Sequence, residues 1–428
     1  MVKYLKPIVL GLAAAGVVAY ADPSVSSLQS QLDQLQARVN SMSAGSSAVG
    51  VHTNAALTQS LLSTQMGSGG NVATLMNAQK SGALADGVTV GGYAEAAAVY
   101  EKVSDAGSTN VNTLQTHTSN IASSTSGEGD ATQLLLPRVE MNVVANMNEW
   151  SMGYFSFGVE NLPGSDATLA IDNAFVTVGN LNQLPVYAFV GRNTIDFGSF
   201  QTVNFSTPSL NRLAFQAYGD QLGVGFMGYG FNGTLTVAND DNTWASGYNT
   251  YTKNNDAVGN YALNVGYGMN TAGADWHVGA GYLAGARQGN TDQVGAYDLN
   301  AKVGYAGFDL LGEFTQTTGD MTGQSNNKLR AWDLGADYNF PLMGKASKVN
   351  VDYSRVSAQY TASQWVVGFS HNTFNNVWMG LEYAQSKGAY VAGTAGTNTV
   401  YSGVVSAAPT SAENVSDATL LFDVQGVF

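Results

Sequence analysis

The chain has 428 residues, with 31 acidic and 17 basic side chains and a formal net charge of −14. Only 11% of residues are charged, against about a quarter in ordinary soluble proteins, and the negative charge opposes nucleic-acid binding. The 50 glycines and 21 tyrosines suit tight turns and aromatic bands. The lack of cysteine excludes disulfides and thiolate metal sites.

Residues 1–21 predict a secretory signal peptide. Lys3 and Lys6 precede an apolar run over residues 8–18, and Ala19-Tyr20-Ala21 has the A-x-A form of a cleavage site. The run is too short to span a bilayer, so we expect the mature chain to begin at Asp22.

Residues 22–42 predict a short helix with heptad spacing. Its apolar positions alternate in steps of three and four: Val25, Leu28, Leu32, Leu35, Val39 and Met42. This pattern is typical of a parallel coiled coil, and we expect it to join copies of the chain, as a trimer, in the periplasm. The alternative is a single amphipathic helix packed against the rest of its own chain.

Residues 43–87 are rich in Ser, Ala and Gly, with weak helical patterns at 55–66 and 72–79. We interpret them as a periplasmic linker or as a small plug that lies inside the structure formed by the later strands. Periodicity does not choose between these alternatives.

From residue 88 onward the apolar pattern has period two, which indicates β-strands. Sixteen segments fit: 88–100, 134–147, 150–159, 169–178, 186–190, 221–229, 231–237, 258–267, 276–284, 297–305, 308–315, 331–340, 349–353, 365–369, 377–383 and 418–428. An even number of strands of this length is typical of bacterial transmembrane barrels. We therefore predict an all-β fold, a transmembrane antiparallel β-barrel of about 16 strands over residues 88–428.

The final strand fits this prediction. Leu420, Phe422 and Val424 share one face, Asp423 and other residues share the opposite face, and the chain ends in an aromatic residue. Such an ending resembles the signal that the outer-membrane barrel-assembly machinery reads in barrel proteins, so we expect Phe428 to carry it. The alternative is an ordinary closing strand of a soluble sandwich.

The connections between the predicted strands alternate between long and short. The long ones include residues 101–133, 192–220, 238–256 and 385–417. A soluble sandwich has no reason to sort its loops in this way. With the amino-terminus in the periplasm, the long loops would lie outside a Gram-negative cell, as transmembrane barrels arrange them.

We predict that the strand faces that carry charged residues point inward, because lysine or arginine facing lipid near the midplane costs about 2–4 kcal/mol. Sixteen strands leave a water-filled lumen, and acids outnumber bases among the residues that we expect to line it, which favours cations. Many of them are expected to pair across strands as ordinary wall residues. The pore-lining candidates are Glu95, Arg138, Glu140, Asp298, Lys302, Glu313, Asp333, Asp337, Asp352 and Asp423.

The connection over residues 191–220 is the best candidate for a constriction. It carries Arg192, Asp196 and Arg212 among several aromatic residues, and a loop of this length is usually functional or disordered. The alternative is a loop that covers the rim of the barrel. We add these three residues to the pore-lining candidates.

No catalytic pattern is present, so we expect no enzyme activity and no cofactor. The four histidines are scattered without zinc-ligand spacing, and the Gly-x-Ser-x-Gly pattern is absent. We expect no metal site.

The stretch DNAFVTVGNLNQLPVYAFVGRNTIDFGSF, residues 172–200, and the later hairpin QLGVGFMGYGFNGTLTV resemble the LbtU-type siderophore porin family. That resemblance extends over most of residues 22–428. It implies a sixteen-stranded outer-membrane barrel that takes up iron-siderophore complexes without the large plug of TonB-dependent receptors. It supplies no binding residue to carry over.

Three functions remain open from the sequence: a siderophore-specific channel, a general cation-preferring diffusion porin, and a structural or adhesive surface protein. The mixed charges on the inward faces favour a channel. The expected surroundings are outer-membrane lipids and lipopolysaccharide, and no nucleic acid is expected as a partner.

Overall fold

The structure is a computed structural model. It describes residues 50–65, 70–104, 110–112, 125–126, 129–162, 168–239, 258–284, 287–288, 292–320, 328–357, 361–388, 390–392, 399–401, 404–405 and 416–428. The predicted signal peptide and heptad helix lie outside these described residues.

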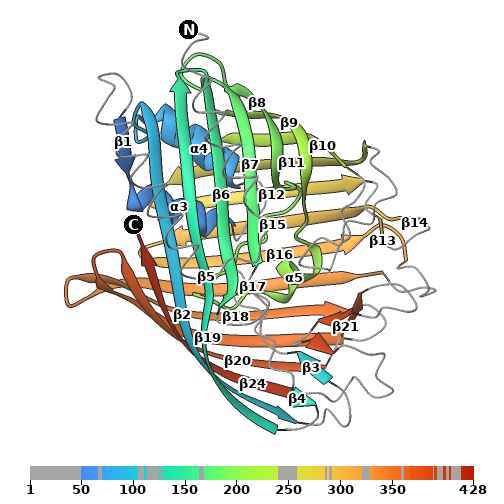
Figure 1. The fold of residues 1–428 in the computed structure, drawn as a ribbon. Coiled ribbons are helices and arrows are strands. Elements are labelled where there is room, and N and C mark those ends of the chain that lie inside the picture. The colour runs from blue at the N-terminus through green and yellow to red at the C-terminus, as the bar shows by residue number, and fades with distance from the viewer. Residues whose placement is uncertain are drawn as a thin grey trace.

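Sixteen antiparallel strands form one closed barrel (Figure 1). Each strand pairs with the next along the chain, and β24 pairs with β2 to close the sheet. The predicted fold class and strand number are therefore confirmed. The strands are β2 (Gly87–Ser104), β5 (Gly129–Asn148), β6 (Ser151–Leu162), β7 (Thr168–Gly179), β8 (Val186–Thr194), β9 (Tyr218–Gly228), β10 (Phe231–Asn239), β11 (Val258–Thr271), β12 (Ala274–Ala284), β15 (Ala296–Tyr305), β16 (Phe308–Thr317), β17 (Arg330–Leu342), β18 (Lys345–Ser357), β19 (Thr361–Phe374), β20 (Val377–Gly388) and β24 (Ser416–Val427).

Two-residue turns join many of the strand pairs at one end of the barrel, which we call the turn end. In four of these turns a non-glycine residue precedes glycine and both have positive φ, as in Tyr229 (59°) and Gly230 (83°). Positive φ at both positions is typical of type I′ turns, whose twist matches that of the flanking strands. The long connections lie at the opposite, loop end, in agreement with the predicted alternation.

Short strand pairs occur within the loop-end connections. They are β3 (Asn110–Asn112), β4 (Thr125–Ser126), β13 (Arg287–Gln288), β14 (Asp292–Gln293), β21 (Tyr390–Ala392), β22 (Thr399–Tyr401) and β23 (Val404–Val405). Strand β23 pairs with β3, so the first and last of these connections meet.

The outward face of the barrel is apolar. On β17, Leu334 is 57% exposed while its neighbour Asp333, which points inward, is 0% exposed. Aromatic rings gather on the outward face near the turn end, where Phe308 and Tyr338 stack with ring centroids 4.3 Å apart. A continuous apolar belt with an aromatic border is typical of a surface in contact with lipid.

We expect Leu334→Lys to lower the free energy of unfolding by about 2–4 kcal/mol, because it places a charge near the middle of this belt. The matched control is Leu342→Lys at the turn end of the same strand, where the cost is about 0–1 kcal/mol. Urea titration of the protein folded into vesicles measures both. Equal losses for the two variants would contradict a lipid-facing belt.

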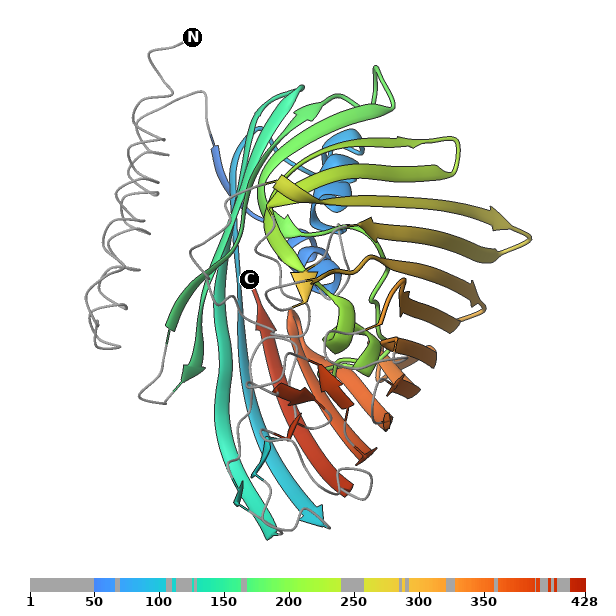
Figure 2. The ribbon, with the colours of Figure 1, turned by 90° about the vertical axis from the view of Figure 1, so that its right-hand side faces the viewer.

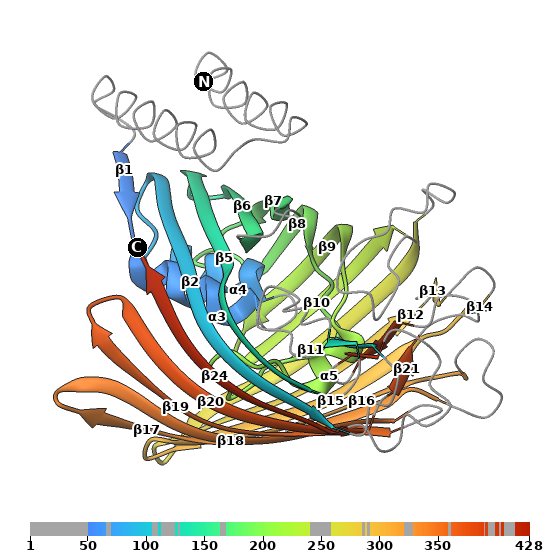
Figure 3. The same cartoon turned by 60° about the horizontal axis from the view of Figure 1, so that its bottom comes forward.

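A second component precedes the barrel strands: β1 (Gly50–Thr53), α3 (Ala55–Gln65) and α4 (Gly70–Lys80). Strand β1 pairs in parallel with the start of β2, at Gly87 to Val90, an edge that β24 leaves free because its pairing begins at Tyr93. Helices α3 and α4, which we call the insert, pack against the inner wall of the barrel (Figures 2 and 3). None of the described helices is long and apolar enough to cross a membrane.

Residues 195–217, between β8 and β9, fold into the barrel, and we call them the inward segment. They include α5 (Leu210–Phe215), which begins after the N-cap Ser209, whose hydroxyl oxygen accepts a hydrogen bond from the Arg212 N–H. Figure 2 shows α5 within the barrel. Side chains of the inward segment form an apolar cluster with residues, most of them alanine, on the inner face of β10 to β12, β15 and β17 to β19.

Candidate functional site

Buried carboxylates hold the inward segment to the inner wall. Glu382 on β20 is 1% exposed and accepts hydrogen bonds from the backbone N–H groups of Phe205, Ser206 and Thr207. The Ser206 hydroxyl also donates to Asp423 on β24. Hydrogen bonds to a charged acceptor are roughly twice as strong as neutral ones, so this cluster fixes the backbone of residues 205–207.

A second carboxylate holds the earlier part of the inward segment. Glu313 on β16 accepts hydrogen bonds from the backbone N–H groups of Ser199 and Phe200, at 2.6 and 2.9 Å. Between the two carboxylates, Lys348 on β18 donates from Nζ to the Val203 carbonyl oxygen at 2.6 Å. The segment is therefore attached to the wall over several strands.

Glycines in the wall make room for this close approach. A Cβ atom on Gly281 would lie 1.5 Å from the Phe197 carbonyl oxygen, and one on Gly380 would lie 2.1 Å from the Phe205 ring. Real Cβ contacts are essentially never that short, so a side chain at Gly281 would displace the backbone of the inward segment and one at Gly380 would displace the Phe205 ring. Glycine at such points allows another backbone to approach closely.

The insert covers the inner wall of β5 to β9 near the turn end. Leu61, Leu75 and Met76 are 0–1% exposed and pack against inward-facing apolar residues of the wall. Gln79 donates to the Asn146 side chain at 3.1 Å, which ties α4 to β5. The wall residues in this cluster are Val144, Met152, Tyr154, Phe175, Tyr187 and Phe189. An apolar patch of this size facing water would be costly, so the contact with the insert stabilises this part of the inner wall.

The remaining inner wall, on the turn-end half of β10 to β12, β15 and β16, is polar and rich in glycine. A Cβ on Gly279 would lie 2.5 Å from the Asn300 side-chain oxygen, and one on Gly266 would lie 2.5 Å from that of Asn232. The amide side chains of adjacent strands therefore lie across the glycines, flat against the wall, which leaves more of the cross-section open.

Charged side chains on this open wall are partly exposed. The side chains of Lys302 and Asp309 are 43% and 28% exposed, and Lys302 Nζ lies 3.5 Å from Asp309 Oδ2. Asp275 on the neighbouring strand is exposed, and its carboxylate accepts a hydrogen bond from Asn270 at 2.6 Å. A solute on this side of the lumen would meet these groups directly.

Most of the predicted pore-lining residues lie on the inner side of the barrel but are buried, at 9% exposure or less. They are Glu95, Arg138, Glu140, Asp196, Arg212, Asp298, Glu313, Asp333, Asp337, Asp352 and Asp423. Many contact other protein groups, as Arg138 does with Glu140 at 2.7 Å and Asp196 with the Thr234 hydroxyl at 2.6 Å. Lys302 alone in the predicted set is both inward-facing and substantially exposed.

Arg192 requires a correction. Strand alternation puts it on the same face of β8 as Val190, whose side chain is 54% exposed on the outward side. It is paired in register with Asp220 on β9, and its Nη1 lies 3.8 Å from Asp220 Oδ1. Arg192 therefore lies on the outer face near the loop end, outside the predicted constriction.

The inward charges Glu382 and Asp309 were not predicted from the sequence. Glu382 lies between the outward residues Leu381 and Tyr383, and Asp309 lies between Phe308 and Leu310. The same alternation that located Asp333 would have found both of them. Nothing in the sequence, however, indicates that the Glu382 carboxylate meets a backbone about 175 residues earlier, since that contact depends on how the inward segment folds.

The histidines take different positions. His277 lies on the open inner wall, paired in register with Lys302. His371 Nδ1 lies 2.8 Å from the Ser347 hydroxyl, and its ring stacks with Phe369 on the outward face. Within the part of the chain that the structure describes, no group of three or more histidine or acidic side chains is arranged to hold a metal ion.

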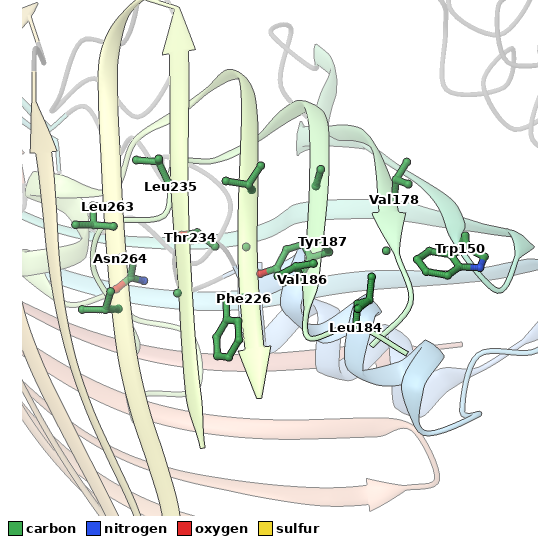
Figure 4. Close-up of a pocket in the computed structure, with 16 residues that line it drawn as sticks. Trp150, Val178, Leu184, Val186, Tyr187, Phe226, Thr234, Leu235, Leu263 and Asn264 are labelled. Atoms are coloured by element: carbon green, nitrogen blue, oxygen red, sulfur yellow. The ribbon is translucent and has the colours of Figure 1, made fainter. Parts of the chain in front are cut away.

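An apolar recess of about 590 Å³ lies on the outer surface, across β7 to β11 (Figure 4). Val178, Val224 and Leu235, each about half exposed, are among its lining residues, together with the small residues Ala188 and Gly233. Most of its large apolar lining residues belong to the outward-facing belt, so we describe this recess as a feature of the outer surface.

No protein-family model matches the chain, and a comparison with curated proteins finds no match either. Solved structures do share its fold. OprB of Pseudomonas putida, in its high-pH structure, is similar with a TM-score of 0.53 and 10% identity, over 79% of this chain and 94% of that one.

The outer-membrane channel DcaP of Acinetobacter baumannii has a TM-score of 0.50 and 12% identity, over 80% of this chain and 97% of that one. OmpF of Salmonella typhi, in complex with daunomycin, has a TM-score of 0.50 and 12% identity, over 80% and 98%. At these identities the likeness concerns the fold alone.

Proposed function

We propose that the protein is an outer-membrane channel that takes up ferric siderophores or similar small solutes without a TonB-type plug. The observation that carries the proposal is the division of the lumen: the inward segment and the insert each cover part of the wall, and the wall between them stays polar. Polar lining favours the passage of hydrated solutes. The fold shared with the DcaP channel supports the same class of function.

The siderophore as solute rests on the resemblance to the LbtU-type siderophore porin family. The small size of the insert supports it, because α3 and α4 together are much shorter than a large plug domain. The main alternative is a general cation-preferring diffusion porin, supported by the acids Asp275 and Asp309, which are at least partly exposed on the open wall. The further alternative, a structural or adhesive surface protein, is favoured only if the lumen carries no current.

The orientation and partners are part of the proposal. The turn end, where the insert lies, would face the periplasm, and the loop end would face outward. The assembly machinery would recognise Phe428 before the barrel closes. In the folded barrel the backbones of Phe428 and Gly92 form two hydrogen bonds, of 2.9 and 3.0 Å. Residues 22–42 would join copies of the chain as a trimeric coiled coil, and lipids with lipopolysaccharide would cover the apolar belt.

Single-channel recording in a planar bilayer tests the proposal. We expect steady conductance that ferric siderophore blocks when it is added to the loop side. Conductance that stays unchanged when ferric siderophore is added would favour the general porin. The absence of conductance from folded protein would contradict the channel and favour the structural role.

A further inference from the structure

Only a few of the many inward charges are placed where an ion in the lumen would meet them. Glu313 and Glu382 are 6% and 1% exposed, and their oxygens accept hydrogen bonds from backbone N–H groups of the inward segment. Asp423 is 1% exposed and accepts from the Ser206 hydroxyl and, at 2.7 Å, from the Gln425 side chain. The inward segment itself lies between these carboxylates and the lumen.

The open wall presents a different group of charges, which we call the wall charges: Asp275, Lys302 and Asp309. Register pairs place both aspartates beside Gly304, one on each neighbouring strand. A Cβ on Gly304 would lie 2.5 Å from Asp309 Oδ1 and 3.8 Å from the Asp275 Cβ. Lys302 lies two residues before Gly304, on the same face of β15. The three side chains therefore form one local group around a gap in the wall.

The charges within this group do not cancel. Lys302 Nζ lies 3.5 Å from Asp309, so one acid is paired with the base. Asp275 accepts a hydrogen bond from the Asn270 side-chain amide, which is neutral and does not offset its charge. The group therefore carries one excess negative charge where water and ions reach it. The neighbouring Lys348 is not equivalent to Lys302, because its Nζ donates to the Val203 carbonyl oxygen.

We propose that the wall charges Asp275, Lys302 and Asp309 set the ion selectivity of the channel, while the buried carboxylates of Glu313, Glu382 and Asp423 mainly position the inward segment. This inference rests on the proposed channel function and names the residues that carry its charge preference. An exposed charge beside a narrow path attracts or repels each passing ion. A buried carboxylate whose oxygens accept hydrogen bonds from backbone donors is shielded from direct contact with such an ion.

The reversal potential across a bilayer with a KCl gradient tests this assignment. We expect wild-type protein to prefer cations modestly. Lys302→Gln frees Asp309 and should strengthen the cation preference, whereas Asp309→Asn frees Lys302 and should abolish or reverse it. Asp275→Asn should weaken it, so the expected order is Lys302→Gln, then wild type, then the two aspartate variants.

Two control variants remove one positive and one negative charge at positions away from the open wall. Lys345→Gln alters a turn-end lysine that donates to Asn375, and Asp220→Asn alters an acid on the outward face. Both should leave the reversal potential close to that of wild type. The assignment of selectivity would be overturned, and the channel function would stand, in either of two cases. The reversal potential could shift equally in the control and wall-charge variants, or it could stay unchanged in wall-charge variants that still conduct. A folded wild-type protein without current would overturn the channel function and this assignment with it.

Discussion

Glu382→Ala is expected to release the inward segment from the wall and to raise the single-channel conductance. The substitution removes the acceptor of three backbone N–H groups, those of Phe205, Ser206 and Thr207. Each buried N–H left without a partner costs about 1–3 kcal/mol. The barrel strands do not depend on this carboxylate for their ladder, so the barrel should still form while the docked position of the segment becomes unstable.

Cysteine labelling offers a second measurement that does not depend on current. The natural chain has no cysteine, and Ala214 in α5 is 0% exposed, so Ala214→Cys creates a single buried thiol. A water-soluble maleimide should react with it slowly in the otherwise unchanged protein and faster when Glu382→Ala is added. Glu149→Ala, at a turn outside the lumen, is the matched control. Slow labelling together with unchanged conductance in the Glu382→Ala background would refute the role of Glu382 in holding the inward segment to the wall.

The strands were predictable from the sequence because lipid and water impose opposite demands on alternate residues. On β17 the series Trp332, Leu334 and Ala336 alternates with Asp333 and Asp337, and the structure places the two sets on opposite faces. Apolar and polar residues therefore alternate with a period of two along the strand, and this pattern can be recognised without knowing any distant contact. The alternation of long and short connections follows from the same topology.

The contents of the lumen were less predictable, because they break that pattern. On β6 and β7 the inward residues Tyr154 and Phe175 are apolar, since they face the insert instead of water. Because both faces of these strands are apolar, the sequence pattern does not show that the insert covers the inner face. The inward position of the segment over residues 195–217 depends on contacts such as Glu313 with Phe200, more than 110 residues apart in the chain, and only the three-dimensional structure brings them together.

Glycine in the wall was informative only after the fold was known. In the sequence, Gly281 and Gly380 look like ordinary strand glycines, which usually weaken a strand. In the structure each is the point at which the inward segment touches the wall. The sequence therefore contained a signal for the contact between the inward segment and the wall, but interpreting it requires knowing which inward positions would otherwise hold a side chain.

Met76→Asp in α4 is expected to detach the insert from the inner wall and to widen the passage at the turn end. Met76 is 0% exposed and belongs to the apolar cluster that α3 and α4 share with the wall. Truncation of a buried methionine costs about 2–5 kcal/mol, and burial of an unpaired carboxylate adds a further penalty. The polar contacts of α4 with the wall include the hydrogen bonds from Gln79 to Asn146 and Asn148, which do not replace the lost apolar contacts.

The neighbouring variant Asn77→Asp separates detachment from charge. Asn77 is exposed on the same helix, so this variant adds the same negative charge at almost the same place while the apolar contacts remain. We expect Met76→Asp to raise conductance in a planar bilayer and Asn77→Asp to leave it near the wild-type value. Equal effects in the two variants would mean that charge, not detachment, controls the current. Unchanged conductance in folded Met76→Asp protein would mean that the insert does not limit the passage, and the narrow point would then be the inward segment alone.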